Sequence, residues 1–244
     1  MAENKKKGFN INSNTYIIMY STVMVVIVAF VLAFVYKQLK PMQDVNVSLD
    51  KKMQVLSALN MRDIDKADAE DTYANTIKAD MIFDAEGTVL AQGKQGGESD
   101  GFRLTSADYK QGRLALYVCE VQGETKYVVP VYGMGLWGPI WGYIALDADG
   151  NTIYGAYFNH ESETAGLGAE IKDSKDFQNQ FRGKLIANQS GEVSIKVRKS
   201  DGKPADSYTC DGITGATLTS DGVSLMLHDC MSRYQKAIQS VTKK

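Results

Sequence analysis

Hydrophobic and polar positions divide the chain into one long apolar run followed by shorter alternating and helical patterns. The run from Tyr16 to Tyr36 carries no charge and reads YIIMYSTVMVVIVAFVLAFVY. It is about as long as the ~20 residues that a helix needs to cross a bilayer. Tyrosines near both ends suit the headgroup region, and the run is longer than the apolar part of a signal peptide. The pattern therefore predicts a retained transmembrane helix over 16–36.

Lysines flank this run on both sides, so their count does not fix its orientation. A short amino-terminal segment commonly stays in the cytoplasm while a long following domain is translocated. We therefore expect a cytoplasmic segment over 1–15, the transmembrane helix, and an extracytoplasmic domain over 37–244.

Beyond Pro41 the pattern changes between helical and strand periodicity. Apolar residues three and four apart between Val45 and Asn60 predict an amphipathic helix, which we interpret as a stalk or cap. Apolar runs around turn residues predict paired strands at 81–83 with 88–90, 114–121 with 127–132, and 140–146 with 152–158. The glycine-bearing stretch 93–101 is interpreted as a surface loop.

The last part of the chain adds helices and one more strand. Phe177, Phe181 and Leu185 share a helical face, and alternation over 193–197 is typical of a strand. A closing helix has its apolar side at Val223, Leu227, Met231, Tyr234 and Ile238. The predicted fold class is α+β, an antiparallel sheet with flanking helices, preceded by one transmembrane helix.

Composition narrows the function classes only slightly. With 27 basic and 29 acidic residues, the chain has no basic surplus, so we do not expect nucleic acid as a partner. Three cysteines and two histidines give no spacing typical of a zinc site, and we expect no metal. One disulfide plus a free thiol remains open beside three structural thiols.

The segment from Asp211 to Ser220 reads DGITGATLTS and stands just before the closing helix. Gly215 and Ala216 leave the backbone accessible to another protein, and Thr217 offers a nucleophilic hydroxyl. Ser220 suits a helix cap. A phosphate on Thr217 would lie near the helix amino terminus, which favours an anion, although a plain glycine turn at a helix start explains the same residues.

This segment resembles the motif Asp-x-x-Ser/Thr-Gly-Ala-Ser/Thr, at which a flavin transferase moves FMN from FAD onto the last hydroxyl. Two further runs, GMGLWGPIWGYIAL over 133–146 and HESETAGLGAEI over 160–171, are similar to segments of the same family. The family is that of the C subunits of the sodium-translocating NADH:quinone reductases. The resemblance covers nearly the whole chain and is most specific from Tyr132 to Tyr234.

The resemblance implies that Thr217 carries FMN covalently through a phosphoester and that Asp211, Gly215 and Ala216 are recognised by the transferase. Its FMN-binding region would span about 130–235. Further cofactor-binding residues implied by the three motifs are Leu136, Trp137, Glu163, Thr164, Gly166, Leu167, Gly168, Lys199, Thr214, Gly215 and Ala216.

The physical character of these segments agrees with a bound flavin. Glycines let backbone approach a flat ring, and Leu136, Trp137 and Leu167 supply apolar and aromatic cover. Glu163 and Thr164 can hydrogen-bond the polar edge of the ring, although such a carboxylate is more often simply solvated. For Trp141 we expect core packing.

The family implies an electron relay in a six-subunit complex of the bacterial inner membrane that oxidises NADH, reduces ubiquinone and exports sodium. The domain would face the periplasm, and NADH oxidation is not expected from this chain alone, because it lacks a GxGxxG fingerprint. The chain has Ala165 where the family usually has proline, and Thr214 where serine is frequent.

Two other interpretations stay open. The flavin subunit of the Rnf complex shares the transferase motif, although the segment Gly135-Leu136-Trp137 favours the quinone reductase. A cofactor-free, membrane-anchored binding or scaffold domain would make Thr217 an ordinary residue of a helix start.

Overall fold

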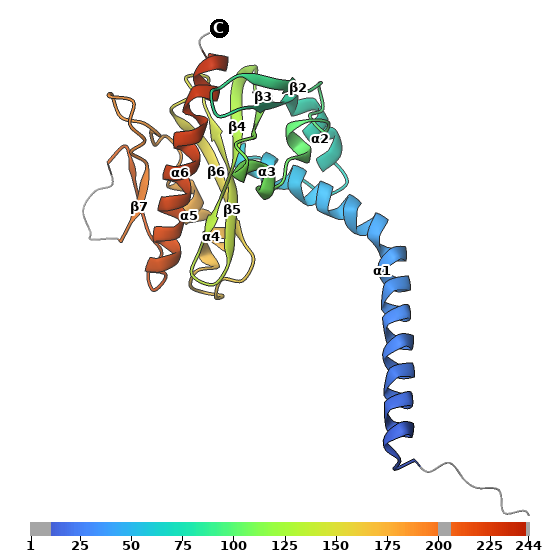
Figure 1. The fold of residues 1–244 in the computed structure, drawn as a ribbon. Coiled ribbons are helices and arrows are strands. Elements are labelled where there is room, and N and C mark those ends of the chain that lie inside the picture. Colours follow the sequence, from blue (N-terminus) through green and yellow to red (C-terminus); the bar gives the residue numbers. More distant parts are fainter. Residues whose placement is uncertain (1–10, 200–205, 243–244) are drawn as a thin grey trace, which may run out of the picture. The chain divides into compact units, whose positions relative to one another are not determined.

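A computed structural model describes residues 11–199 and 206–242 of the chain (Figure 1). The chain forms two compact units, Met1–Ser48 and Leu49–Lys244. The second unit contains every strand of the described residues and all three motif segments.

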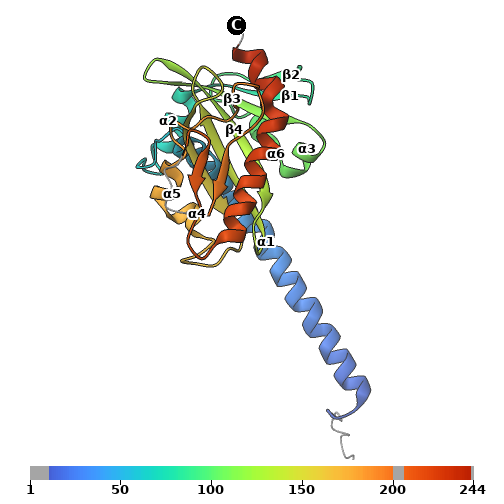
Figure 2. The same ribbon diagram turned by 90° about the vertical axis from the view of Figure 1, so that its left-hand side faces the viewer.

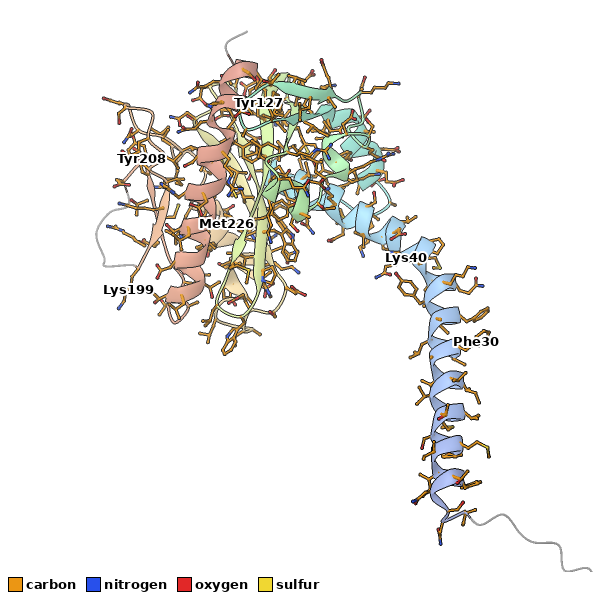
Figure 3. The ribbon with its side chains drawn as sticks, viewed as in Figure 1. Phe30, Lys40, Tyr127, Lys199, Tyr208 and Met226 are labelled. Atoms are coloured by element: carbon orange, nitrogen blue, oxygen red, sulfur yellow. The ribbon has the colours of Figure 1, made fainter. Side chains whose placement is uncertain are left out.

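The first long helix, α1 (Asn14–Ala58), contains the predicted transmembrane stretch. Among the described residues it is the one helix long and apolar enough to cross a membrane, and its apolar window is entirely exposed. Phe30, for example, is 72% exposed and points away from the helix axis (Figure 3). An exposed apolar stretch of this length is what a bilayer would cover.

The sequence suggested two separate helices here, but α1 is continuous through Pro41. Proline removes one backbone donor from the helix interior, and the helix continues on either side of that gap. Within the second unit, Leu56 and Leu59 are buried as predicted.

The predicted antiparallel sheet is confirmed, with six strands in the order β2-β1-β3-β4-β5-β6. Their bounds are β1 (Ile77–Phe83), β2 (Val89–Gln92), β3 (Leu114–Val121), β4 (Glu124–Met134), β5 (Pro139–Leu146) and β6 (Ile153–His160). Each predicted hairpin joins the expected strands. The stretch 93–101 contains no regular element before η1 (Gly101–Arg103), although Gly97 is buried against Ile77.

Small helices surround the sheet. They are α2 (Ala69–Thr76), α3 (Ser106–Lys110), α4 (Glu170–Asp173) and α5 (Lys175–Asn179). The predicted helix through Phe177, Phe181 and Leu185 is wrong in length, because α5 ends at Asn179 and Gly183 then adopts a φ of +76°. Phe177 and Phe181 still pack together against Phe158 of β6, since burial and not helix length holds them.

The closing helix α6 (Thr217–Thr242) packs against β4, and all five residues of its predicted apolar side are buried. A two-stranded parallel pair, β7 (Lys196–Arg198) with β8 (Thr209–Asp211), lies beside it (Figure 2). The predicted strand over 193–197 is therefore mostly irregular, although Val193, Ile195 and Val197 are buried. Strand β8 was not predicted.

One edge of β4 is covered by a side chain instead of a strand. Strand β3 pairs only with residues 124–128 of β4, so the rest of β4 extends past it. There Cys230 of α6 lies 3.4 Å from both the backbone nitrogen and the carbonyl oxygen of Tyr132. The thiol thus occupies the position that a neighbouring strand would take.

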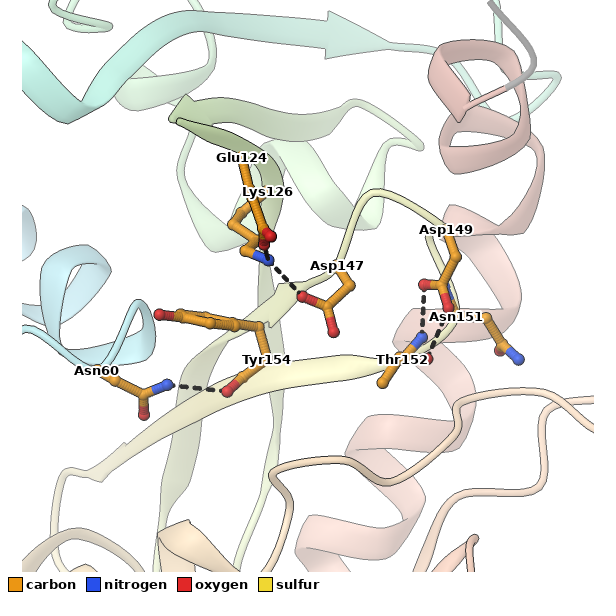
Figure 4. A network of polar contacts seen from close by, with 8 residues as sticks. All are labelled: Asn60, Glu124, Lys126, Asp147, Asp149, Asn151, Thr152 and Tyr154. Carbon is orange, nitrogen blue, oxygen red and sulfur yellow. Dashed lines mark hydrogen bonds and ion pairs between the residues drawn. The ribbon is translucent and has the colours of Figure 1, made fainter. Parts of the chain in front are cut away.

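A buried lysine, Lys126, connects the hairpin of β3 and β4 with the hairpin of β5 and β6 (Figure 4). Lys126 Nζ lies 2.6 Å from a carboxylate oxygen of Glu124 and 2.6 Å from one of Asp147. Its ammonium also lies 4.6 Å from the centre of the Tyr154 ring. Burial lowers the pKa of Lys126, but hydrogen bonds and the charges of both carboxylates outweigh burial and raise it.

Candidate functional site

Three segments that are far apart in sequence meet at the start of α6. They are the turn between β4 and β5, the loop after β6, and the segment that leads from β8 into α6. The first turn is closed by a hydrogen bond from Gly135 N to Gly138 O at 2.8 Å. The loop after β6 is closed by Leu167 N donating to Thr164 O at 3.1 Å, with Gly166 at a φ of +72°.

Glu163 connects all three segments. Its side chain is only 7% exposed. One carboxylate oxygen accepts a hydrogen bond from Trp137 N at 2.8 Å, and the other accepts one from the Thr219 hydroxyl at 2.6 Å. The carboxylate is therefore not merely solvated, because both oxygens bind donors within the protein, and a contact of Glu163 with the cofactor stays a prediction.

Two glycines make room for this carboxylate. A Cβ atom on Gly135 would lie 2.5 Å from one Glu163 oxygen, and a Cβ on Gly168 would lie 2.4 Å from the other. Any side chain at either position would collide with Glu163. These glycines therefore serve the packing of the protein on itself, whatever they also contribute to a ligand.

Thr217 is exposed and is the first residue of α6. Gly215 precedes it with a φ of +81°, a backbone conformation that glycine adopts easily. Ala216 is buried, and its carbonyl accepts a hydrogen bond from Ser220 N at 2.9 Å. The hydroxyl of Thr217 is thus accessible beside the unpaired N–H groups of a helix amino terminus.

The predicted cap by Ser220 is wrong, because α6 begins at Thr217, four residues before the start that a Ser220 cap implies. Ser220 lies in the first turn of α6, where its hydroxyl accepts a hydrogen bond from Ile213 N at 3.0 Å. It therefore fixes the segment that leads into the helix.

Two residues from outside the motifs hold the segment at Asp211 and Gly212. Gln180 accepts from Asp211 N at 2.8 Å and donates to Asp211 O at 3.2 Å. Arg198 O accepts from Gly212 N at 2.6 Å, and Arg198 Nε lies 3.8 Å from a carboxylate oxygen of Asp211. Sequence reasoning missed both residues, since Gln180 lies 31 positions from Asp211 with no spacing signal between them.

Exposed apolar side chains lie on the three segments that meet at the start of α6. Trp137 is 66% exposed and Leu218 is 61% exposed, and Leu136 and Leu167 are also exposed. A Cβ on Gly215 would lie 2.9 Å from Leu167 Cδ2, so Leu167 lies directly against the segment before Thr217. Clustered apolar exposure of this kind marks binding surfaces. Leu218 was missed, although an apolar residue directly after the candidate attachment residue was a usable signal.

The remaining candidates are three exposed polar residues. Thr164 and Thr214 each belong to a turn. Lys199 follows β7 (Figure 3), where the pairing of Arg198 with Asp211 puts it level with Gly212. A role of these three residues in ligand binding stays a prediction.

The three cysteines form no disulfide. Burial raises the pKa of the Cys210 thiol to about 12, and burial also raises the pKa of Cys230. Trp141, for which core packing was predicted, is only partly buried and donates from Nε1 to Gln54 Oε1 at 3.1 Å. A pocket of about 540 Å³ lies between α3, β4, β5 and α6 and shares no residue with the candidate cofactor residues.

Comparison with known sequences first defines the class. Residues 135–232 match the family described as FMN-binding domain. This range contains every candidate cofactor residue of the three motifs, including Thr217. The fold and the site thus define a protein with an FMN-binding domain.

Relatives over most of the chain define the particular family. The chain is 33% identical over 205 residues to the C subunit of the Na(+)-translocating NADH-quinone reductase of Haemophilus ducreyi, covering 76% of this chain and 77% of the relative. It is 32% identical over 203 residues to the corresponding protein of Neisseria meningitidis, with the same coverage. The chain belongs to the family of the C subunits of the Na(+)-translocating NADH-quinone reductases.

Solved structures agree. The crystal structure of the C subunit from Parabacteroides distasonis has 37% sequence identity and a TM-score of 0.74, covering 82% of this chain and 96% of that one. Shewanella oneidensis NqrC, at 21% identity, has a TM-score of 0.68 over 82% of this chain and 100% of that one. The second likeness concerns the fold alone.

Proposed function

We propose that this chain carries FMN covalently, through a phosphoester with the Thr217 hydroxyl, as an electron-transfer subunit of a sodium-translocating NADH:quinone reductase. The observation that carries the proposal is the position of Thr217. It is an accessible hydroxyl at the first residue of a long helix, and the two loops that meet this helix start carry exposed apolar side chains.

The residues around Thr217 fit the two chemical halves of FMN. A phosphate there lies next to the free N–H groups and the positive end of the α6 dipole, both of which stabilise an anion. Leu136, Trp137 and Leu167 can cover an apolar ring, together with Leu218. The exposed ammonium of Lys199 can offset negative charge.

FMN, when bound, supplies the redox chemistry, and the protein supplies attachment, orientation and charge. A covalent bond keeps the cofactor in place while electrons pass to and from other subunits. The exposure of the cluster around Thr217 supports exchange with partners at this end of α6.

Attachment requires a partner enzyme, which we propose is a flavin transferase that recognises Asp211, Gly215 and Ala216. The backbone of this segment is held by Gln180 and Ser220, while Gly215 and Thr217 stay exposed. A segment of fixed shape with an accessible hydroxyl suits recognition by another protein's active site.

We place the chain in the bacterial inner membrane through the helix over 16–36, with the domain over 37–244 on the periplasmic side. The partners are the lipid bilayer and the other subunits of a six-subunit complex. The relatives are named as subunits of an NADH-quinone reductase, which supports such an assembly. Membership of this family favours the quinone reductase over the Rnf complex, and the FMN-binding match favours a flavoprotein over a cofactor-free scaffold.

The test is mass spectrometry of the full chain produced together with a flavin transferase. We expect one FMN adduct on the peptide that carries Thr217. Thr217→Val should lose it, since valine keeps the shape but has no hydroxyl, whereas Thr217→Ser should retain it. An adduct that persists in Thr217→Val and survives denaturation would contradict the assignment.

A further inference from the structure

Glu163 has a structural position that its place in a surface loop did not suggest. A carboxylate that loses water must find other donors, because an unpaired buried charge is very costly. Glu163 finds two, and they belong to different segments, namely the backbone of Trp137 and the hydroxyl of Thr219.

These two donors belong to two different segments of the candidate site. Trp137 belongs to the turn that presents the exposed indole ring, and Thr219 lies two residues after Thr217 in the first turn of α6. The Thr219 side chain is itself buried, so its bond to Glu163 is shielded from water. The carboxylate therefore ties the indole-bearing turn to the helix start.

The loop that carries Glu163 is anchored independently. Glu163 N donates to His160 Nδ1 at 3.2 Å, and Thr164 O accepts hydrogen bonds from both Leu167 N and Ala169 N. Both segments thus bind to a carboxylate whose own backbone is fixed.

We propose that Glu163 is a positioning residue that holds the turn carrying Trp137 in a set place relative to the start of α6, instead of a residue whose main role is to contact the flavin. The inference rests on the proposed function for the identity of the bound group. The position of Trp137 can nevertheless be measured without any flavin.

Two substitutions separate geometry from the carboxylate itself. In Glu163→Gln, the amide oxygen can accept from Trp137 N and the amide nitrogen can donate to the Thr219 hydroxyl. In Glu163→Ala, both connections are lost. If Glu163 is a positioning residue, Glu163→Gln should leave the motion of Trp137 restricted and Glu163→Ala should not.

The experiment uses the full chain in detergent with Trp141→Phe, which leaves Trp137 as the single tryptophan, and with Thr217→Ala, which excludes attachment. Time-resolved anisotropy of Trp137 is compared among Glu163, Glu163→Gln and Glu163→Ala, with Thr219→Val as a second way to break the connection. Glu161→Ala is the matched control, since it removes an exposed carboxylate two positions away.

We expect the fast local motion of Trp137 to grow about twofold in amplitude in Glu163→Ala, to grow less in Thr219→Val, and to stay unchanged in Glu163→Gln and Glu161→Ala. Thermal unfolding of each variant identifies loss of fold. If Glu163→Ala does not fold, Thr219→Val decides alone. Unchanged Trp137 motion in folded variants that lack the connection would overturn the proposal.

A second measurement, with Thr217 restored and a flavin transferase present, relates the result to the cofactor. Flavin emission should rise in Glu163→Ala, since a displaced indole quenches it less, and should stay near wild type in Glu163→Gln. If no variant carries FMN while the anisotropy result holds, the proposed function fails and the positioning role stands.

Discussion

At the residue scale, Gly222 shows how closely α6 approaches the sheet. A Cβ atom there would lie 2.4 Å from the carbonyl oxygen of Met134, at the end of β4. Alanine normally stabilises a helix interior relative to glycine by about 1 kcal/mol. At Gly222 the collision with the Met134 carbonyl should make alanine destabilise the protein instead.

We expect Gly222→Ala to lower the free energy of unfolding by about 1–3 kcal/mol, the usual range for overpacking, as measured by chemical denaturation. Ser232→Ala, on an exposed position of the same helix, should change it by less than about 0.5 kcal/mol. A Gly222→Ala variant that is more stable than the parent would refute the close approach.

Sequence reasoning reached part of the candidate site at this scale. The motif around Thr217 and its nearness to the closing helix follow from local residue types, although α6 begins earlier than a Ser220 cap implies. Gln180 and Arg198 could not be predicted, because their contacts with the segment at Asp211 depend on tertiary packing across distant positions. Ser220 was misread for a local reason, since a hydroxyl can cap a helix or fix the preceding turn equally well.

At the scale of elements, strands that form hairpins were predictable and strand β8 was not. The strands of the sheet carry repeated apolar residues around turn signals, and these patterns act over a few residues. Strand β8 has three residues and pairs in parallel with β7, so no tight turn joins the two strands and no local pattern indicates their pairing. Helix α5 likewise ends at Asn179, although the apolar spacing of Phe177, Phe181 and Leu185 predicts a longer helix.

The Lys126 connection between two hairpins yields a prediction at this scale. The side chain of Asp147 is 33% exposed and that of Glu124 is 73% exposed, so solvent screens the ion pair of Lys126 with Glu124 more strongly. We therefore expect Asp147→Asn to lower the free energy of unfolding by about 1–2 kcal/mol and Glu124→Gln to lower it by less. After Asp147→Asn, the buried Lys126 keeps only the exposed Glu124 as a charged partner. Urea unfolding of both variants measures the difference, and equal losses would show that the two pairs are equivalent.

At the scale of the whole molecule, the apolar part of α1 leads to a prediction about membrane topology. The chain should stay in the membrane fraction after alkaline carbonate washing, and deletion of residues 1–36 should release the domain. In spheroplasts, external protease should digest the domain, since we propose that it faces the periplasm. A domain protected until the membrane is broken would place it on the cytoplasmic side.

The part of β4 that does not pair with β3 has a consequence for how the chain matures. An unpaired strand edge is a template for association with other chains. Helix α6, the last of the described elements, lies along that edge with Cys230 against the Tyr132 backbone. Until α6 docks, the sheet remains prone to aggregation. Thr217 begins that same helix. A transferase that requires the docked helix would therefore modify only chains in which α6 already covers the edge of β4.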